Sequence, residues 1–144
     1  MKATVRLEIV SLEAEIFSGL AEMVVVTGIM GELGILPGHM PLLTAIQPGQ
    51  IRITLQGGVQ DIYYISGGLM EVQLDVITIL ADTVTRATDI DEAAAITARE
   101  SAERLLANKT SNVDFTSALV QIAQATAKLR TIKLLHKNKS KSEK

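Results

Sequence analysis

The sequence predicts an α+β fold in which an N-terminal antiparallel β-sandwich is followed by a C-terminal antiparallel α-helical hairpin. All ten glycines and all three prolines lie at or before Gly68, so the residues that most often interrupt helices are absent from the rest of the chain. Short alternating segments fill the first part, whereas alanine is frequent in the second. We expect the sandwich over residues 1–86, the hairpin over 87–136 and a basic disordered tail over 137–144.

The first part is expected to form short strands joined by tight turns. Apolar and polar residues alternate, as in strands buried on one face, over residues 5–9, 51–56 and 71–76. Denser runs of aliphatic residues over 23–26 and 76–80 fit strands that are covered on both faces. Gly57-Gly58 and Gly67-Gly68 supply the positive φ angles that tight hairpins require. This spacing of strands and turns favours an antiparallel sandwich.

The second part is expected to form two helices. Asp89 and Glu92 resemble a capping box, which predicts a helix from about Ile90 to Ala107. Asp114 can begin a second helix that runs towards His136. Its apolar side recurs every three or four residues, at Phe115, Ala118, Ile122, Ala125, Leu129, Ile132 and His136. Ala95, Ala98, Ala102 and Leu105 form a matching row on the first helix, so the two helices should pack as a hairpin.

Alanine occupies most of the facing positions in this hairpin. Each buried methylene contributes about 0.8 kcal/mol, so an alanine row stabilises the hairpin by several kcal/mol less than a leucine row would. We therefore expect a hairpin that forms locally and can detach at low cost.

Composition excludes several kinds of site. The chain has no cysteine, so disulfides and thiolate metal ligands are excluded. The two histidines, His39 and His136, have no partner at metal-ligand spacing, and we expect no metal and no cofactor. No apolar run approaches the roughly 20 residues that a helix needs to cross a bilayer. Only four aromatic residues are present and none is tryptophan, so stacking platforms for single-stranded nucleic acid are absent.

Charge is distributed unevenly along the chain. Residues 125–144 hold seven basic residues and one acid, and the first 124 hold seven basic residues and fifteen acids. The body is therefore acidic and the C-terminal end basic, which suits an acidic partner. One function that fits these features is that of a free-standing adaptor, a β-sandwich with a basic helical tail that binds an acidic partner. An enzyme would need a polar cluster in a cleft, and the sequence offers none.

Residues 28–50 carry five of the glycines and all three prolines among aliphatic side chains. Gly28, Gly31 and Gly34 match neither a P-loop nor a dinucleotide fingerprint, because the Gly-Lys-Ser/Thr ending and the G-x-G-x-x-G spacing are both missing. Ser66 is not in a G-x-S-x-G turn. Prolines around His39 hold an apolar turn in one shape, which favours a surface that binds another protein.

Several distinctive segments lie between about residue 5 and residue 135. They are Phe17-Ser18-Gly19, Gly31-Glu32-Leu33-Gly34-Ile35, Pro37-Gly38-His39, Pro41-Leu42-Leu43-Thr44, Gln47-Pro48-Gly49, Ser66-Gly67-Gly68, Leu80-Ala81-Asp82-Thr83 and Val113-Asp114-Phe115. In their order and spacing, these segments resemble the epsilon subunits of bacterial F-type ATP synthases. The resemblance implies the same sandwich and helical hairpin that the residue pattern predicts.

The resemblance further implies a non-catalytic rotor subunit of the central stalk, which couples rotation of the c-ring to ATP synthesis. Its partners would be the gamma subunit, the polar loops of the proton-driven c-ring and the alpha/beta catalytic head. It would lie on the cytoplasmic face of the bacterial inner membrane, attached only through the complex. The implied contacts with gamma and the c-ring are Gly31, Glu32, Leu33, Gly34, His39, Met40 and Pro41. The hairpin would inhibit ATP hydrolysis, with Lys128, Arg130 and Lys133 contacting acidic loops of the head.

One departure from the family pattern concerns nucleotide binding. Members that bind nucleotide carry an Ile/Leu-Asp-x-x-Arg-Ala box at the start of the first helix. Here Ile90 and Asp91 are retained, but Ala94 stands where the arginine would be, and Gln124 stands where a further arginine would help. Because alanine cannot grip a phosphate as the planar guanidinium does, we expect ATP binding to be weak or lost.

Overall fold

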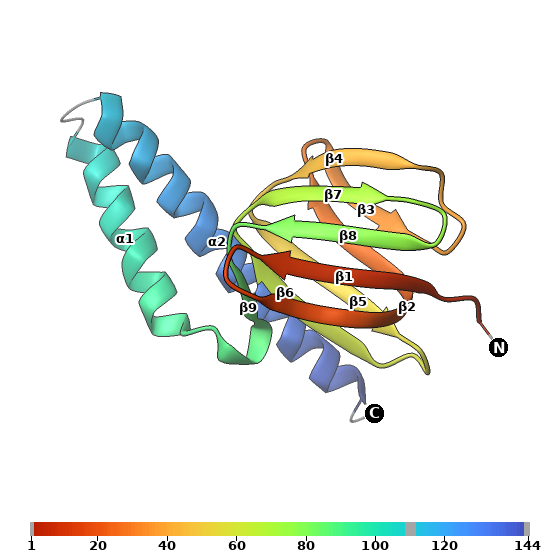
Figure 1. Cartoon of the computed structure of the whole chain (residues 1–144). Coiled ribbons are helices and arrows are strands. Elements are labelled where there is room, and N and C mark those ends of the chain that lie inside the picture. Colours follow the sequence, from red (N-terminus) through yellow and green to blue (C-terminus); the bar gives the residue numbers. More distant parts are fainter. Residues whose placement is uncertain (1, 109–111, 143–144) are drawn as a thin grey trace. The chain divides into compact units, whose positions relative to one another are not determined.

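The structure, a computed structural model, describes residues 2–108 and 112–142, with the backbone alone for residues 112–114. The chain divides into two compact units, Met1–Arg86 and Ala87–Lys144 (Figure 1). The first is built from strands and the second from helices, which confirms the predicted fold class.

Nine strands form the first unit among the described residues. They are β1 (Val5–Ser11), β2 (Glu15–Gly28), β3 (Gly31–Ile35), β4 (Leu42–Ile46), β5 (Gly49–Leu55), β6 (Gln60–Ile65), β7 (Gly68–Val72), β8 (Val76–Ala81) and β9 (Val84–Arg86). The order of pairing is β1-β8-β7-β4-β2-β5-β6-β9, with β3 beside β2. The long strand β2 also pairs with β1, and its register with β5 shifts between Ala21 and Met23. This strand therefore passes from one layer of the sandwich to the other.

One strand pair differs from the predicted antiparallel arrangement. Strands β1 and β8 pair in parallel, with Leu7 opposite Ile77 and Ile9 opposite Ile79. Every other pair among the described strands is antiparallel. Parallel neighbours need a long connection, and here the intervening chain builds most of the sandwich. The alternation of side chains predicts which face is buried but leaves the direction of the neighbouring strand open.

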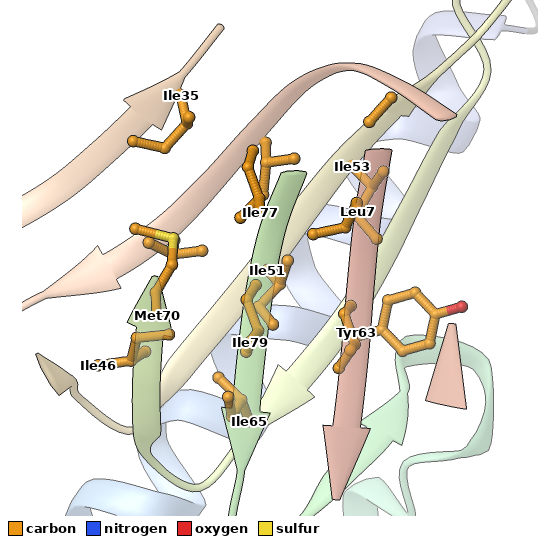
Figure 2. Close-up of a cluster of buried hydrophobic side chains, with 14 of the residues drawn as sticks. Leu7, Ile35, Ile46, Ile51, Ile53, Tyr63, Ile65, Met70, Ile77 and Ile79 are labelled. Atoms are coloured by element: carbon orange, nitrogen blue, oxygen red, sulfur yellow. The ribbon is translucent and has the colours of Figure 1, made fainter. Parts of the chain in front are cut away.

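The core lies between the two layers, and branched aliphatic side chains fill it (Figure 2). Leu7 and Ile9 of β1, Ile51 and Ile53 of β5, and Ile77 and Ile79 of β8 are all fully buried. These are alternate residues of their strands, because successive side chains point to opposite faces. Full burial of each such side chain stabilises the fold by about 1.5–3 kcal/mol.

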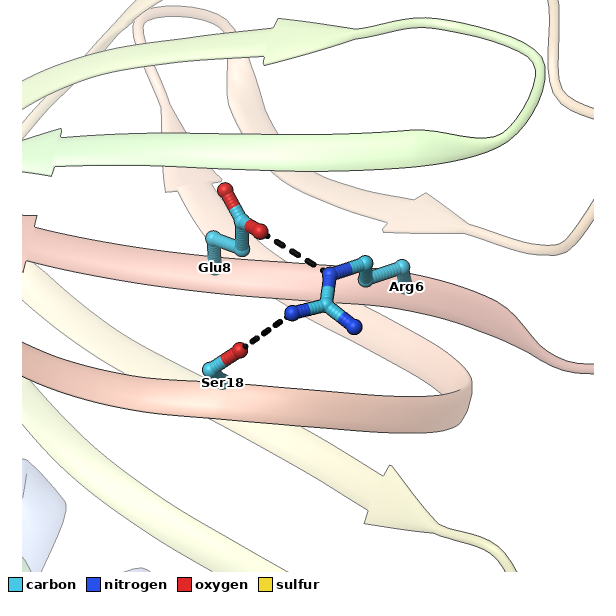
Figure 3. A network of polar contacts seen from close by, with 3 residues as sticks. All are labelled: Arg6, Glu8 and Ser18. Atoms are coloured by element: carbon cyan, nitrogen blue, oxygen red, sulfur yellow. Dashed lines mark hydrogen bonds and ion pairs between the residues drawn. The ribbon is translucent and has the colours of Figure 1, made fainter.

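Polar residues occupy the outward positions of the same strands. Arg6 on β1 donates from Nε to Glu8 Oε1 and from Nη2 to Ser18 Oγ on β2, at 2.9 Å each (Figure 3). Arg6 and Glu8 are both substantially exposed, so this ion pair contributes about 1 kcal/mol or less. The network follows the alternation of the strand and has no role in the core.

The Ser66-Gly67-Gly68 turn between β6 and β7 is joined to the turn after β8. Ser66 Oγ accepts hydrogen bonds from the Thr83 amide at 3.0 Å and from the Thr83 hydroxyl at 2.7 Å. A side chain at Gly68 would collide with the Leu80 carbonyl oxygen, and the Gly68 φ angle is 155°. The segments Ser66-Gly67-Gly68 and Leu80-Ala81-Asp82-Thr83 therefore have a structural role, which is to bring two turns into close contact.

The second unit consists of a 3-10 turn, η1 (Ala87–Asp89), and two helices, α1 (Glu92–Asn108) and α2 (Asn112–Ser142). The predicted N-cap of the first helix, Asp89, is wrong. Asp91 Oδ1 accepts a hydrogen bond from the Ala94 amide at 3.0 Å, so Asp91 caps α1. Asp89 is part of η1 instead, and the helix begins later than Ile90 because that turn precedes it. The second helix begins at Asn112, before the predicted Asp114.

The two helices pack against each other, and one series of their buried positions recurs every seven residues. Ala95 and Ala102 on α1, and Ala118, Ala125 and Ile132 on α2, form this series, and Ala127 and Thr131 of α2 are buried as well. The predicted rows are too wide, because Ala98, Leu105, Phe115 and His136 are exposed. An alanine seam is narrow, because the helices meet along small side chains, so these four positions beside it stay in solvent.

Helix α2 continues through residues that we expected to be disordered. It runs to Ser142, so residues 137–142 of the predicted 137–144 tail are helical, and residues 143–144 lie outside the described residues. Ser140 Oγ and Ser142 Oγ donate to the carbonyl oxygens of Lys137 and Lys139. Lysines in the last turn also interact favourably with the helix dipole. Charge composition alone therefore predicted disorder incorrectly in this segment.

Candidate functional site

The β2–β3 hairpin presents an apolar turn next to a charged side chain. Ile29 and Met30 form the turn and are 60% and 98% exposed. Gly31 follows with a φ angle of 123°, which favours glycine. Glu32 lies opposite Thr27 and Gly34 opposite Val25 on β2. The hairpin thus places large apolar side chains in solvent at a position that the strand pairing holds rigid.

Glu32 is paired with a cation from another strand. Its Oε2 accepts a hydrogen bond from Arg52 Nη2 on β5 at 3.1 Å, and the Glu32 side chain is 50% exposed. The Leu33 side chain is partly buried and packs against the sandwich core. A side chain at Gly34 would crowd the Met23 methyl group. The charged group that this hairpin presents is therefore half of an ion pair. Leu33 and Gly34 beside it fix the backbone of the hairpin.

The loop over residues 36–41 presents a second apolar surface. Leu36 is 56% exposed and Met40 77% exposed. His39 closes the turn: its amide donates to the Leu36 carbonyl at 3.1 Å and its Nδ1 donates to the Met40 carbonyl at 2.7 Å. Gly38 has a φ angle of 81°. His39 thus holds the loop in shape through its own backbone neighbours, and Met40 is the side chain most available for contact.

A shallow depression adjoins this loop where β4 begins beside the end of β7. Its volume is about 330 Å³, and its lining residues are Pro41, Leu42, Leu43, Glu71, Val72 and Gln73. Leu43 is 70% exposed beside it. Glu71 is the one carboxylate among these lining residues, and it accepts a hydrogen bond from Gln73. A single carboxylate is not an acid–base pair, so the depression suits contact with a side chain of another protein better than a reaction.

The structure does not bring the two predicted contact regions together. Glu32 lies near the β2–β3 turn, whereas His39, Met40 and Pro41 follow the other end of β3. A strand rises about 3.3 Å per residue, so β3 separates the two regions along its length (Figure 1). The sandwich therefore presents two separate exposed apolar surfaces, around Met30 and around Met40.

The predicted basic residues lie on α2. Arg130 and Lys133 are exposed, and Lys128 is half-buried. Arg130 and Lys133 share a face because three residues separate them, whereas Lys128 and Arg130 do not. Exposed lysines continue the Arg130 row at Lys137 and Lys141. The helix therefore carries a basic stripe that extends beyond the residues selected from sequence.

The start of α1 holds the remnants of the nucleotide box. Asp91 caps the helix through the Ala94 amide, and Ala94 is exposed. This end of the helix has its capping carboxylate in place and no guanidinium at the arginine position, so it lacks the group that would hold a phosphate. Within residues 2–108 and 112–142, no group of three or more His, Asp or Glu side chains is placed to hold a metal ion, and no helix is long and apolar enough to span a membrane.

Sequence reasoning missed Arg52, Ile29 and Met30 as parts of the site. Arg52 is the single charge between two buried isoleucines of β5, and such an outward charge on a strand was a usable signal. Nothing in the sequence indicated that Glu32, two strands away, would be its partner, since the pairing of β2 with β3 and β5 is not visible there. Met30 lies between glycines at a turn, which indicates exposure.

Comparison with known proteins agrees with this architecture. The family model described as the beta-sandwich domain of the ATP synthase delta/epsilon chain matches residues 4–87. The one described as the long alpha-helix domain of the same chain matches residues 88–133. The ATP synthase epsilon chain of Legionella pneumophila strain Corby is 53% identical over 137 residues, covering 95% of this chain and 98% of the relative. The chain of strain Lens is equally similar.

Two solved structures share the fold. A chain of the Euglena gracilis mitochondrial ATP synthase has a TM-score of 0.81 at 21% identity, covering 88% of this chain and 80% of that one. A chain of the Tetrahymena thermophila mitochondrial ATP synthase central stalk and c-ring has a TM-score of 0.62 at 12% identity, covering 91% and 98%. Together with the family models and the close relatives, these matches confirm the resemblance seen in the sequence: the chain belongs to the family of ATP synthase delta/epsilon chains.

Proposed function

We propose that this chain works as a non-catalytic central-stalk subunit of a proton-translocating F-type ATP synthase, coupling c-ring rotation to ATP synthesis in the catalytic head. The observation that carries the proposal is the 53% identity to an epsilon chain over nearly the full length of both proteins. The partners are the gamma subunit, the polar loops of the c-ring and the alpha/beta head. The chain lies on the cytoplasmic face of the bacterial inner membrane and is held there by the complex.

The sandwich is the coupling module in this proposal. Its two exposed apolar points, around Met30 and Met40, are carried by strands that share one packed core. A stiff support transmits torque without deforming, because packed interiors have low compressibility. Glu32 supplies a polar contact to the ring loops at the first point, and the loop at His39 contacts gamma or the ring at the second.

The hairpin is the regulatory module. Its seam of alanines stabilises the folded pair of helices only modestly, so rearrangement costs little. When the helices extend into the catalytic head, the stripe with Arg130 and Lys133 meets acidic loops and restrains ATP hydrolysis. Nucleotide has no strong role in this switch, since Ala94 replaces the phosphate-binding arginine.

Reconstitution of the depleted synthase tests both modules. The full-length chain and a chain ending at Thr88, which keeps the whole first unit, are added separately, and binding and ATP hydrolysis are measured. Intact binding with raised hydrolysis after truncation supports both assignments. Unchanged hydrolysis contradicts the regulatory role alone. Full proton-coupled synthesis after joint Glu32→Ala and His39→Ala replacement contradicts the coupling role. Calorimetry of the isolated chain should detect no millimolar or tighter ATP binding.

A further inference from the structure

Arg52 reaches Glu32 by crossing an intervening strand. Arg52 on β5 lies opposite Val25 of β2, and Glu32 on β3 lies opposite Thr27 of the same strand. Strands are about 4.8 Å apart, so β5 and β3 are roughly 10 Å apart. Only a long side chain can cover that distance, and the Arg52 Nη2 to Glu32 Oε2 distance of 3.1 Å shows that it does.

The ion pair between Arg52 and Glu32 holds each side chain differently. Arg52 is the less exposed partner, at 31% against 50% for Glu32, and its Nε is buried without an acceptor in the described part of the chain. Burial of this stem restricts the guanidinium to few orientations. Glu32 has one oxygen on Arg52, and within residues 2–108 and 112–142 its Oε1 has no recorded partner. The carboxylate is thus fixed at one oxygen and open at the other.

We propose that Arg52 is a positioning residue that orients the Glu32 carboxylate, so that Oε1 faces a hydrogen-bond donor on the loop of the partner. This inference rests on the proposed function, in which Glu32 contacts the c-ring. Arg52 already neutralises the carboxylate, so the partner need not supply a second full charge, and an amide or hydroxyl group beside the apolar Met30 surface satisfies the site. Holding the carboxylate in one orientation reduces the entropy lost on binding.

The test uses membranes that carry the synthase depleted of this chain. The affinity of the added chain and the proton pumping per ATP hydrolysed are measured for Arg52→Gln, Arg52→Lys, Glu32→Gln and the Arg52→Gln/Glu32→Gln double variant. We expect Arg52→Gln to weaken binding about two- to fivefold, the range of an exposed ion pair. It should have no further effect once Glu32 is glutamine, because the two residues act as one unit. Arg52→Lys should restore part of the affinity.

Arg6→Gln is the matched control. Arg6 also points outward from a strand and pairs with a carboxylate at 2.9 Å, but it has no link to Glu32, so binding should not change. Thermal unfolding of each variant shows whether the sandwich remains folded.

Two results separate this inference from the proposed function. If Glu32→Gln weakens binding but Arg52→Gln weakens it equally with and without Glu32, Arg52 acts independently and the inference alone is overturned. The same holds if Arg52→Gln lowers the unfolding temperature and Arg52→Lys restores nothing. If Glu32→Gln leaves both binding and proton pumping unchanged, the Glu32 contact and the role of Arg52 fall together.

Discussion

The two units of this chain both hold their secondary structure together by burying side chains, but they bury side chains of different size. The sandwich core is made mostly of leucine, isoleucine, valine, methionine and tyrosine from both layers, with two alanines. The buried residues of the hairpin are mostly alanines. Each unit is locally regular, but the burial that stabilises it differs by several methylenes per position. Stability therefore differs between the units for reasons of side-chain size rather than secondary structure.

This difference matches the work proposed for each unit. A rotor contact must keep its shape under load, and a densely packed core resists deformation. A switch must move between states separated by a few kcal/mol, which a small-residue seam permits.

The largest effect is expected from a cavity in the sandwich core. Ile53 is fully buried, so Ile53→Ala should lower the free energy of unfolding of the sandwich by about 2–5 kcal/mol. Hydrogen exchange of amides in β5 and β6, measured in the full-length chain, reports this loss. Leu43→Ala is the control, since Leu43 is 70% exposed and its loss should change the value by about 0.5 kcal/mol or less. Equal losses in both variants would contradict the assignment of the core.

A smaller effect is expected from the hairpin seam. Ala102 is fully buried and Ala98 on the same helix is exposed. Glycine at either position costs about 1 kcal/mol in helix propensity, and Ala102→Gly also loses a buried methyl group, for a total of about 2 kcal/mol. Exchange of α1 amides measures both values, and the sandwich amides should not change in either variant. If Ala98→Gly proved as costly as Ala102→Gly, the seam would be wrongly placed.

The helix cap should contribute about 1 kcal/mol. Asp91→Ala removes the acceptor of the Ala94 amide and should destabilise the first turn of α1. Asp89→Ala, in the preceding turn, removes no recorded capping bond to α1. Helix content by circular dichroism and exchange at Ala94 compare the two variants. A greater loss from Asp89→Ala would restore the cap predicted from sequence.

The smallest effect at neutral pH concerns the two tyrosines, which both belong to the sandwich. Burial raises the pKa of Tyr64 to about 12 and also raises the pKa of Tyr63, whose ring lies 5.5 Å from Arg86. Because the folded pKa of Tyr64 lies above its ordinary value of 10.0, its contribution to stability is full below pH 10 and is lost as pH rises from 10 to 12.

Tyrosinate absorbance reports on the sandwich alone, since the chain has two tyrosines and no tryptophan. The tyrosines should ionise together with unfolding at high pH. Ionisation near pH 10 in a chain that remains folded would show that neither ring is buried.

Local residue patterns were sufficient for most of the fold. Alternation identified the strands and their buried faces, and the glycine and proline boundary at Gly68 separated the units. The helix cap and the end of α2 were misplaced. Several residues near a helix end can cap it, and the choice of Asp91 over Asp89 depends on the turn formed by η1. The C-terminal lysines and serines were predicted to be disordered from their composition. Composition does not indicate whether a preceding helix continues.

The chemistry of the site depended more on the assembled sandwich. Sequence indicated an exposed, turn-rich segment with Glu32 and His39, because glycines, prolines and a lone charge are visible in one dimension. Only the fold showed that β3 separates these residues and that Arg52 lies within reach of Glu32. Side-chain periodicity is a local property set by backbone geometry, so it can be read directly from the sequence. Which strands become neighbours, in which direction and at what register, depends on packing between distant segments, and the Glu32–Arg52 pair exists only once that packing is complete.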